Sequence, residues 1–210
     1  MGYRLLWDGN SGKGWTAAKN EIFPKNGWNI QDGVLSVLKD LAGQPAMGGD
    51  ILTEKEYGAF ELKFDFKMTE GANSGLKYFV NTLNGSALGL EYQILDDEKH
   101  PDAKMGIKGN RTLASLYDLV PAQKVPASIK KMGEWNQAMI RVLPDNKVEH
   151  WLNGYKVLEF NRGSDEFKAF IAQSKFKNVQ GFGLTLAGKI MLQDHGDEVS
   201  FRSLKIRELK

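Results

Sequence analysis

The 210-residue sequence contains no cysteine. Disulfide bridges, thiolate metal sites and cysteine nucleophiles are therefore excluded, whereas the compartment is left open because exported proteins can also lack cysteine. No stretch approaches the roughly 18 apolar residues of a membrane-spanning helix, so no membrane span is expected. There is no basic block either, and the 28 basic and 26 acidic residues nearly cancel, giving +2. Nucleic acid is therefore not an expected partner.

Glycine and alternating apolar residues are what the sequence has in abundance. The 23 glycines make up about 11% of the chain, against an average near 7%. Phe60–Met68 alternates apolar and charged residues without interruption, which predicts a strand with one face in a core. Trp28–Gln31 and Val34–Val37 flank Asp32-Gly33, a dipeptide typical of a type I′ hairpin turn.

Further segments with strand character follow along the chain, and only one segment has helical spacing. The expected strands are residues 76–81, 89–95, 113–116, 135–143, 148–152, 155–160, 181–187 and 199–207. Ser164 is placed to cap a short helix that runs to about Ser174. The apolar residues of segment 97–111 recur at neither strand nor helix spacing, which predicts a long loop. Long loops in compact domains are often functional. The pattern predicts an all-β fold, a jelly-roll sandwich of two antiparallel sheets in one domain over residues 1–210.

The run around Glu91 is the most informative for chemistry. In a strand, Glu91 and Gln93 project from one face while Tyr92 and Ile94 project from the other. Asp96 would point to the opposite face from Glu91 unless the strand ends or bulges before it. Because conventional glycosidases need two carboxyl groups, glycoside hydrolysis by an acid pair on this strand is disfavoured. The alternative is an ordinary solvated sheet face, on which most strand glutamates lie.

His195 is the second candidate for chemistry, because histidine transfers protons near neutral pH. A neighbouring carboxylate, Asp194 or Asp197, could orient its ring. The competing interpretation is a plain turn between two strands, since these residue types all favour turns. His100 in the long loop is a weaker candidate, and His150 is expected on an outer sheet face.

Polar residues near a third segment could contact a ligand. Asn73 lies in a tight turn that leads into a strand, and Lys77 follows four residues later. Lys77 and Phe79 are expected to share one face of that strand. Asn73 and Lys77 could donate hydrogen bonds to sugar hydroxyls or an oxyanion, although a simple hairpin explains the same pattern. Tyr117 comes directly after an expected strand and is placed to overhang a cleft.

Read in order, these segments resemble the 3-keto-disaccharide hydrolase domain family. Matching pieces run through nearly the whole chain in the family's order: Leu6-Trp7-Asp8-Gly9-Asn10, Asp32-Gly33-Val34-Leu35, Asn73-Ser74-Gly75, Glu91-Tyr92-Gln93-Ile94-Leu95-Asp96, Trp151-Leu152-Asn153-Gly154 and Leu192-Gln193-Asp194-His195-Gly196. The resemblance implies a concanavalin-like jelly roll that handles oxidised sugars. It also implies a periplasmic or secreted protein. Because residues 1–4 contain no apolar leader, an export signal would then have been removed.

The expected activity is a hydrolase or lyase that cleaves 3-keto-glycosides, 3-keto-disaccharides among them. Elimination at carbon 2 followed by hydration needs one base rather than two glycosidase carboxylates. We expect Glu91 and His195 to be catalytic, one as base and the other at the leaving group. The expected substrate-binding residues are Asn73, Lys77, Gln93, Tyr117, Gln193 and Asp96.

A metal ion is the one cofactor that these residue types suggest. Glu91, Gln93 and His195 offer oxygen and nitrogen donors that calcium or manganese accepts. The expected partner is a carbohydrate substrate, and the sequence makes no prediction of oligomeric state. The alternative function is a non-catalytic, lectin-like carbohydrate-binding module, because jelly rolls serve both purposes.

Overall fold

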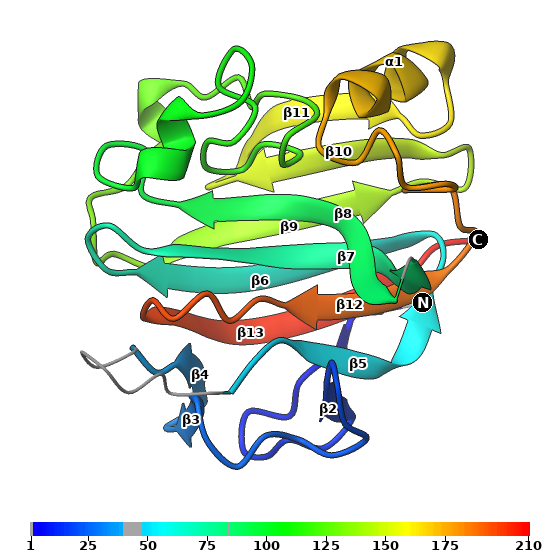
Figure 1. Cartoon of the computed structure of the whole chain (residues 1–210). Coiled ribbons are helices and arrows are strands. Elements are labelled where there is room, and N and C mark those ends of the chain that lie inside the picture. Colours follow the sequence, from blue (N-terminus) through cyan, green and yellow to red (C-terminus); the bar gives the residue numbers. More distant parts are fainter. Residues whose placement is uncertain (1, 40–47, 84) are drawn as a thin grey trace.

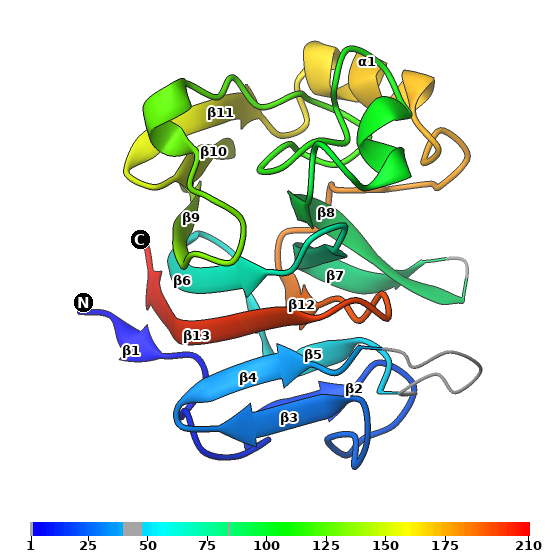
Figure 2. The same ribbon diagram turned by 90° about the vertical axis from the view of Figure 1, so that its left-hand side faces the viewer.

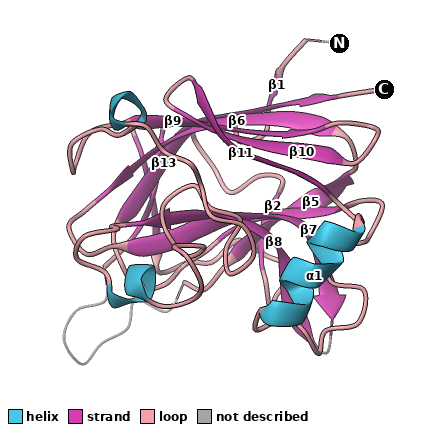
Figure 3. Ribbon diagram, turned by 90° about the horizontal axis from the view of Figure 1, so that it is seen from above, coloured by secondary structure: helices cyan, strands magenta, loops and turns pink. Residues whose placement is uncertain are grey.

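The computed structural model describes residues 2–39, 48–83 and 85–210, which form two antiparallel β-sheets packed face to face (Figures 1 and 3). The larger sheet has the strand order β11-β10-β9-β6-β13-β4-β3, with β1 beside β13, and the smaller has the order β2-β5-β12-β7-β8. The strands are β1 (Arg4–Leu5), β2 (Trp15–Ala17), β3 (Trp28–Gln31), β4 (Val34–Val37), β5 (Ile51–Tyr57), β6 (Phe60–Met68), β7 (Asn73–Leu83), β8 (Ser86–Leu95), β9 (Asn136–Val142), β10 (Lys147–Leu152), β11 (Tyr155–Asn161), β12 (Gly188–Leu192) and β13 (Val199–Glu208). The predicted two-sheet sandwich is confirmed.

The core lies between the two sheets and is built from alternate residues of their strands. On β6, Phe60, Leu62, Phe64 and Phe66 are all buried, as the alternation predicts. The facing strands of the smaller sheet contribute the apolar side chains Leu76, Tyr78, Leu90, Tyr92, Ile94, Ile190 and Leu192. Burial of such side chains is the main favourable term in folding.

The turn and helix signals of the sequence are also confirmed. Asp32 and Gly33 both have positive φ, 52° and 74°, as a type I′ turn between β3 and β4 requires. Figure 2 shows this hairpin at one end of the larger sheet. Helix α1 (Asp165–Gln173) begins where Ser164 accepts a hydrogen bond from the backbone of Phe167. None of the helices in the described ranges has the length and apolar character needed to cross a membrane.

Two strand predictions were wrong, and four strands were missed. Residues 113–116 and 181–187 form turns and irregular backbone instead of strands. The missed strands are the short β1 and β2, β5, whose centre is a run of exposed charged residues, and β12, which contains Gly188 and Lys189. Three of the four, β2, β5 and β12, belong to the smaller sheet, so the sequence described this sheet less completely than the larger one.

Residues 114–117 nevertheless lie along the edge of the smaller sheet. The backbone N–H of Gln93 donates to Ser115 O (3.1 Å), and that of Ala114 donates to Gln93 O (2.8 Å). The N–H of Tyr117 donates to Glu91 O (3.0 Å). This segment therefore covers β8, and it fixes Tyr117 next to Glu91.

The prediction that His150 lies on an outer face was wrong. Val148, His150 and Leu152 share the core face of β10, and His150 has no exposed surface. Its ring nitrogens contact Tyr78 Oη and Ala114 O, each at 2.9 Å. Burial lowers the pKa of His150 to about 4, although the contact with Ala114 O acts to raise it. This histidine is a neutral polar link between the sheets.

Phe79 also lies on the opposite face from the one predicted. Its φ is +54°, and the β7–β8 register shifts between Tyr78 and Asn81. This bulge turns Phe79 into the core beside Tyr78 and Phe60. It also places Val80 on the outward face, where a regular strand would have carried Phe79.

Candidate functional site

The candidate site lies on the outward face of the smaller sheet. Leu52, Met191, Lys77 and Glu91 are directly opposed on neighbouring strands, so their side chains share that face. A hollow of about 150 Å³ lies at the Glu91 end of this row. Seven of the eight predicted catalytic and sugar-binding residues line it: Asn73, Lys77, Glu91, Gln93, Tyr117, Gln193 and His195. The fold therefore brings together residues far apart in the sequence.

Glu91 is the buried carboxylate of this hollow. It is only 6% exposed, so the alternative interpretation, a solvated sheet face, was wrong for this position. Its carboxylate lies over Gly75, where an added Cβ would meet Glu91 Oε1 at 2.1 Å. Burial raises the pKa of Glu91, while the positive charges of Lys77 and Lys175 act to lower it. A buried carboxylate with a raised pKa is a stronger base than an exposed one once it is ionised.

Lys175 is a charged residue of the hollow that the sequence did not predict. It follows the end of helix α1, where no periodicity marks it, and its backbone N–H donates to Asp118 Oδ2 (2.7 Å). The residue as a whole is exposed, but its amine lies 4.2 Å from the centre of the Tyr117 ring. Loss of water around the amine lowers the pKa of Lys175, although the nearby Glu91 carboxylate acts to raise it.

The ring of Tyr117 lies close to two cations. The Arg111 guanidinium lies 5.4 Å from the ring centre and Lys175 lies on the ring at 4.2 Å. Arg111 itself is fixed by Asp102 (2.8 Å) and Asp118 (2.7 Å). Burial raises the pKa of the Tyr117 hydroxyl, and the neighbouring Asp102 raises it further. The phenol is therefore neutral, and the long loop that carries Asp102 and Arg111 helps to position it.

Gln93 and Asn73 form a polar pair at the base of the hollow. The Gln93 Nε2 group donates to Asn73 Oδ1 at 3.3 Å. Among the described residues, Gln93 Oε1 has no hydrogen-bond partner, although Gln93 is only 1% exposed. A buried oxygen of this kind costs free energy unless a ligand or water satisfies it. The arrangement suits a bound hydroxyl group.

His195 lies at the exposed rim. The carboxylate oxygens of Asp194 accept from the backbone N–H groups of Gly49 (2.8 Å) and Gly196 (3.0 Å). Asp197 accepts from the backbone N–H of Asn73 at 3.0 Å. Both aspartates therefore organise the turn that presents His195 to the hollow.

Asp96 lies outside the hollow. Its carboxylate accepts from the backbone N–H groups of Gly71 (2.8 Å), Glu98 (3.0 Å) and Lys99 (3.2 Å). Although burial acts to raise it, these hydrogen bonds lower the pKa of Asp96 overall. Asp96 orders the start of the long loop, and the structure gives it no position from which to touch a ligand in the hollow.

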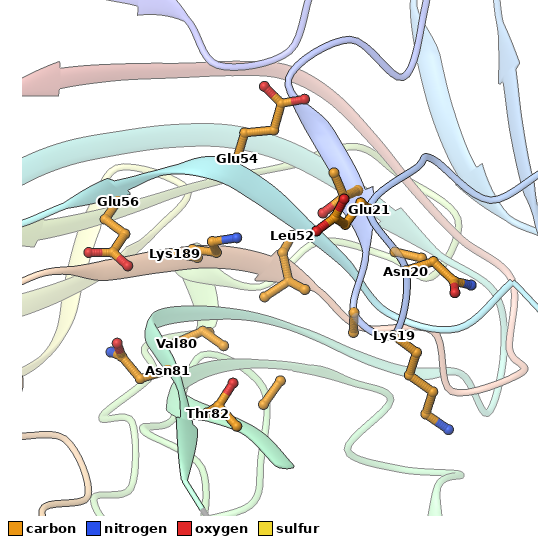
Figure 4. Close-up of a pocket in the computed structure, with 14 residues that line it drawn as sticks. Lys19, Asn20, Glu21, Leu52, Glu54, Glu56, Val80, Asn81, Thr82 and Lys189 are labelled. Atoms are coloured by element: carbon orange, nitrogen blue, oxygen red, sulfur yellow. The ribbon is translucent and has the colours of Figure 1, made fainter. Parts of the chain in front are cut away.

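A larger hollow of about 720 Å³ opens on the same sheet face, towards β2 and β5. Figure 4 shows its floor, which includes Leu52 and Val80, and its polar rim. The rim carboxylates Glu54 and Glu56 are exposed, and Lys189 lies beside them. Because the described carboxylates that line this hollow are all exposed, the smaller one is the better candidate for chemistry.

Comparison with known proteins gives a consistent picture. The model of the family described as 3-keto-alpha-glucoside-1,2-lyase-like domain matches residues 2–207. The chain is 34% identical to a Bacteroides thetaiotaomicron protein named 3-keto-disaccharide hydrolase. That alignment covers 99% of this chain and 79% of the relative.

Solved structures of similar shape include one with clear sequence similarity. A crystal structure of a candidate glycosyl hydrolase from Parabacteroides distasonis superimposes with a TM-score of 0.85 at 31% identity. It matches 100% of this chain and 94% of that chain. A carbohydrate-binding module from Bacillus subtilis gives a TM-score of 0.52 at 11% identity, covering 93% of this chain and 96% of its own. The second similarity concerns the fold alone.

Proposed function

Because this chain belongs to the 3-keto-alpha-glucoside-1,2-lyase-like domain family, we propose that it cleaves 3-keto-glycosides, 3-keto-disaccharides among them. The observation that carries the proposal is the buried Glu91 carboxylate, which lines one hollow with two lysines, Lys77 and Lys175. A single carboxylate beside two cations does not suit a conventional two-acid glycosidase. It suits removal of a carbon-bound proton next to a ketone.

The proposed reaction is an elimination followed by hydration. A ketone at ring carbon 3 acidifies the proton on carbon 2. A base removes this proton, the bond from carbon 1 to the leaving oxygen breaks, and an enone forms. Water then adds its oxygen to carbon 1, and a proton returns to carbon 2. The sum of the two steps is hydrolysis of the glycosidic bond.

Glu91 is the base in this proposal. Its pKa is raised by burial, while Lys77 and Lys175 keep the ionised form accessible. The same two amines stabilise the negative charge that develops on the ketone oxygen. His195, which is exposed at the rim, assists departure of the leaving oxygen.

The sugar itself is held by the amide pair. Gln93 Oε1 accepts a hydrogen bond from a sugar hydroxyl, which gives this buried oxygen the partner it lacks among the described residues. Asn73 and Gln193 line the same hollow and supply further polar contacts. Tyr117 covers one side of the ring from its fixed position over β8.

Turnover of 3-keto-trehalose in deuterated water tests the reaction. Elimination predicts deuterium at carbon 2 of the keto-sugar product, together with a transient enone that absorbs in the ultraviolet. Mass spectrometry and NMR of the product measure the label. Cleavage with neither deuterium nor enone would exclude the elimination route.

A non-catalytic carbohydrate-binding module is the competing function. Glu91→Gln separates the two, because it removes the base but preserves the size of the side chain. An enzyme should lose turnover by at least about 100-fold while it retains sugar affinity. Glu54→Gln is the matched control, since it alters an exposed carboxylate on the same sheet face, in the neighbouring hollow. A chain that binds the sugar but gives no turnover in either form would be a binding module.

We also infer that the protein acts outside the cytoplasm, in the periplasm or after secretion. The support is the family resemblance. Fractionation of the native cells followed by immunodetection tests it, and recovery in the cytoplasm alone would contradict it.

A further inference from the structure

Three side chains of types that can bind a metal ion meet at the rim of the hollow. One ligand atom each from His100, His195 and Asp197 lies within 4.8 Å of the others. The two histidine rings are arranged edge to face, with centroids 6.1 Å apart and an interplanar angle of 83°. His100 precedes the 3₁₀-helix η1 (Pro101–Lys104) in the long loop, whereas the other two lie between β12 and β13.

Each of the three side chains has a donor atom to spare. Asp197 Oδ2 accepts from the backbone of Asn73, which leaves Oδ1 for another partner. His100 Nδ1 accepts from the backbone N–H of Asp102 at 3.2 Å, which leaves Nε2. The side chain of His195 is exposed at the rim, so its ring nitrogens are accessible.

We propose that His100, His195 and Asp197 bind one divalent transition-metal ion, with manganese as the reference ion. Two imidazole nitrogens and one carboxylate oxygen form a donor set that first-row transition metals accept, whereas calcium requires oxygen ligands. Of the expected metal-binding residues Glu91, Gln93 and His195, only His195 belongs to this set. Glu91 and Gln93 remain available to act on the sugar.

The position of the cluster gives the ion a role, which rests on the proposed function. A 3-keto-sugar carries hydroxyl groups next to its ketone, and two such oxygens can chelate one metal ion. Three protein ligands leave coordination positions open for them. An ion that holds the ketone oxygen withdraws electron density and acidifies the neighbouring carbon-bound proton. Glu91, which lines the same hollow as His195, is the base that removes it.

Binding through His100 has a local consequence. Because Nδ1 accepts from Asp102, the proton of the neutral ring is on Nε2. An ion on Nε2 displaces that proton to Nδ1 and replaces one long hydrogen bond with a metal–nitrogen bond. The start of η1 therefore shifts when the ion binds, and protons compete with the metal.

Titration of the whole protein with Mn²⁺, followed by electron paramagnetic resonance of the free ion, tests the site without any substrate. The wild type should bind one saturable equivalent. His100→Asn should weaken binding at least 10-fold, because asparagine can still cap η1 but offers no imidazole. Asp197→Asn should do the same. Glu198→Gln, which changes the next and exposed carboxylate, is the matched control and should bind like the wild type.

Either of two results in the titration would overturn the proposal. One is a wild type that binds no saturable equivalent of Mn²⁺, and the other is equal binding by the wild type, His100→Asn and Asp197→Asn. Pulsed electron paramagnetic resonance of the wild type loaded with Mn²⁺ gives a test that does not depend on whether the variants fold. Imidazole ligands should give a nitrogen modulation in the spectrum, and the absence of this modulation would contradict the site. A protein that cleaves 3-keto-sugars but binds no metal would retain the proposed function and lose only this inference.

Discussion

Gly75 leaves free the space that the Glu91 carboxylate occupies. Gly75 is paired with Gln93 across β7 and β8, and a Cβ built on it would come within 2.1 Å of Glu91 Oε1. This position does not need glycine for an unusual backbone angle, because its φ is not in the positive region. It needs glycine because the acid of the site bends over the neighbouring strand.

We expect Gly75→Ala to reduce kcat by about 100-fold, because a methyl group must displace the carboxylate by about 1 Å. Steady-state kinetics with a 3-keto-disaccharide measures the loss. The double variant with Glu91→Gln identifies the cause. If Gly75→Ala acts through Glu91, adding it to Glu91→Gln should cost little more. Fully multiplicative losses would contradict this explanation.

Lys175→Met should lower kcat by about 100- to 1000-fold, the range found when one donor to a developing oxyanion is removed. It should also move the acidic limb of the pH–rate profile to higher pH. The positive charge of Lys175 lowers the pKa of Glu91. Removal of this charge therefore raises the pKa, and Glu91 ionises only at a higher pH. The profile of kcat/KM against pH measures both effects. Lys168→Met, in the exposed surface pair with Asp165, is the control and should leave the profile unchanged.

Gln93→Met should weaken substrate binding rather than folding. The substitution keeps the length of the side chain but removes the buried Oε1 that has no partner among the described residues. Removing such an oxygen offsets the loss of the long contact between Nε2 and Asn73, so the melting temperature should change by only a few degrees. KM should rise about 10-fold. An unchanged KM would show that the sugar does not contact Gln93.

His150 should make the fold sensitive to acid. Its pKa is about 4 in the folded chain, against about 6.5 when unfolded. The unfolded state therefore binds more protons between these values, and stability falls as pH drops from about 6.5 to 4. Denaturant unfolding of the wild type and His150→Gln at several pH values measures this. At pH 7 the wild type should have the larger free energy of unfolding. This difference from His150→Gln should shrink by up to about 3 kcal/mol at pH 4. A difference in the free energy of unfolding that does not change with pH would rule out this role for His150.

The sequence predicted the larger sheet better than the smaller one, for a physical reason. Strands such as β6 bury one face and alternate cleanly, so their period is visible. In β5, three consecutive charged and exposed residues, Glu54, Lys55 and Glu56, interrupt the alternation of apolar and polar residues. The residues on either side of them, Thr53 and Tyr57, are buried. The bulge at Phe79 reverses the alternation within β7, which local sequence does not reveal.

The sequence predicted the site residues that lie in recognisable motifs. It missed a residue that only the tertiary structure brings to the hollow. Glu91, Gln93 and His195 stand in recognisable runs, and all three line the hollow. Lys175 reaches the hollow only because helix α1 and the segment after it lie beyond edge strand β8 (Figure 1). No residue spacing in the sequence predicts this placement. Asp96 belongs to the same run as Glu91, but it turns away to bind backbone N–H groups.

The backbone contacts of residues 114–117 with β8 have an effect beyond the site. An uncovered edge strand presents free N–H and C=O groups and invites another chain to add a strand. Here the groups of Glu91 and Gln93 are already paired within the molecule. The segment that positions Tyr117 at the hollow therefore also protects this sheet edge from pairing with another chain. A substitution that loosens it would be expected to reduce solubility together with turnover.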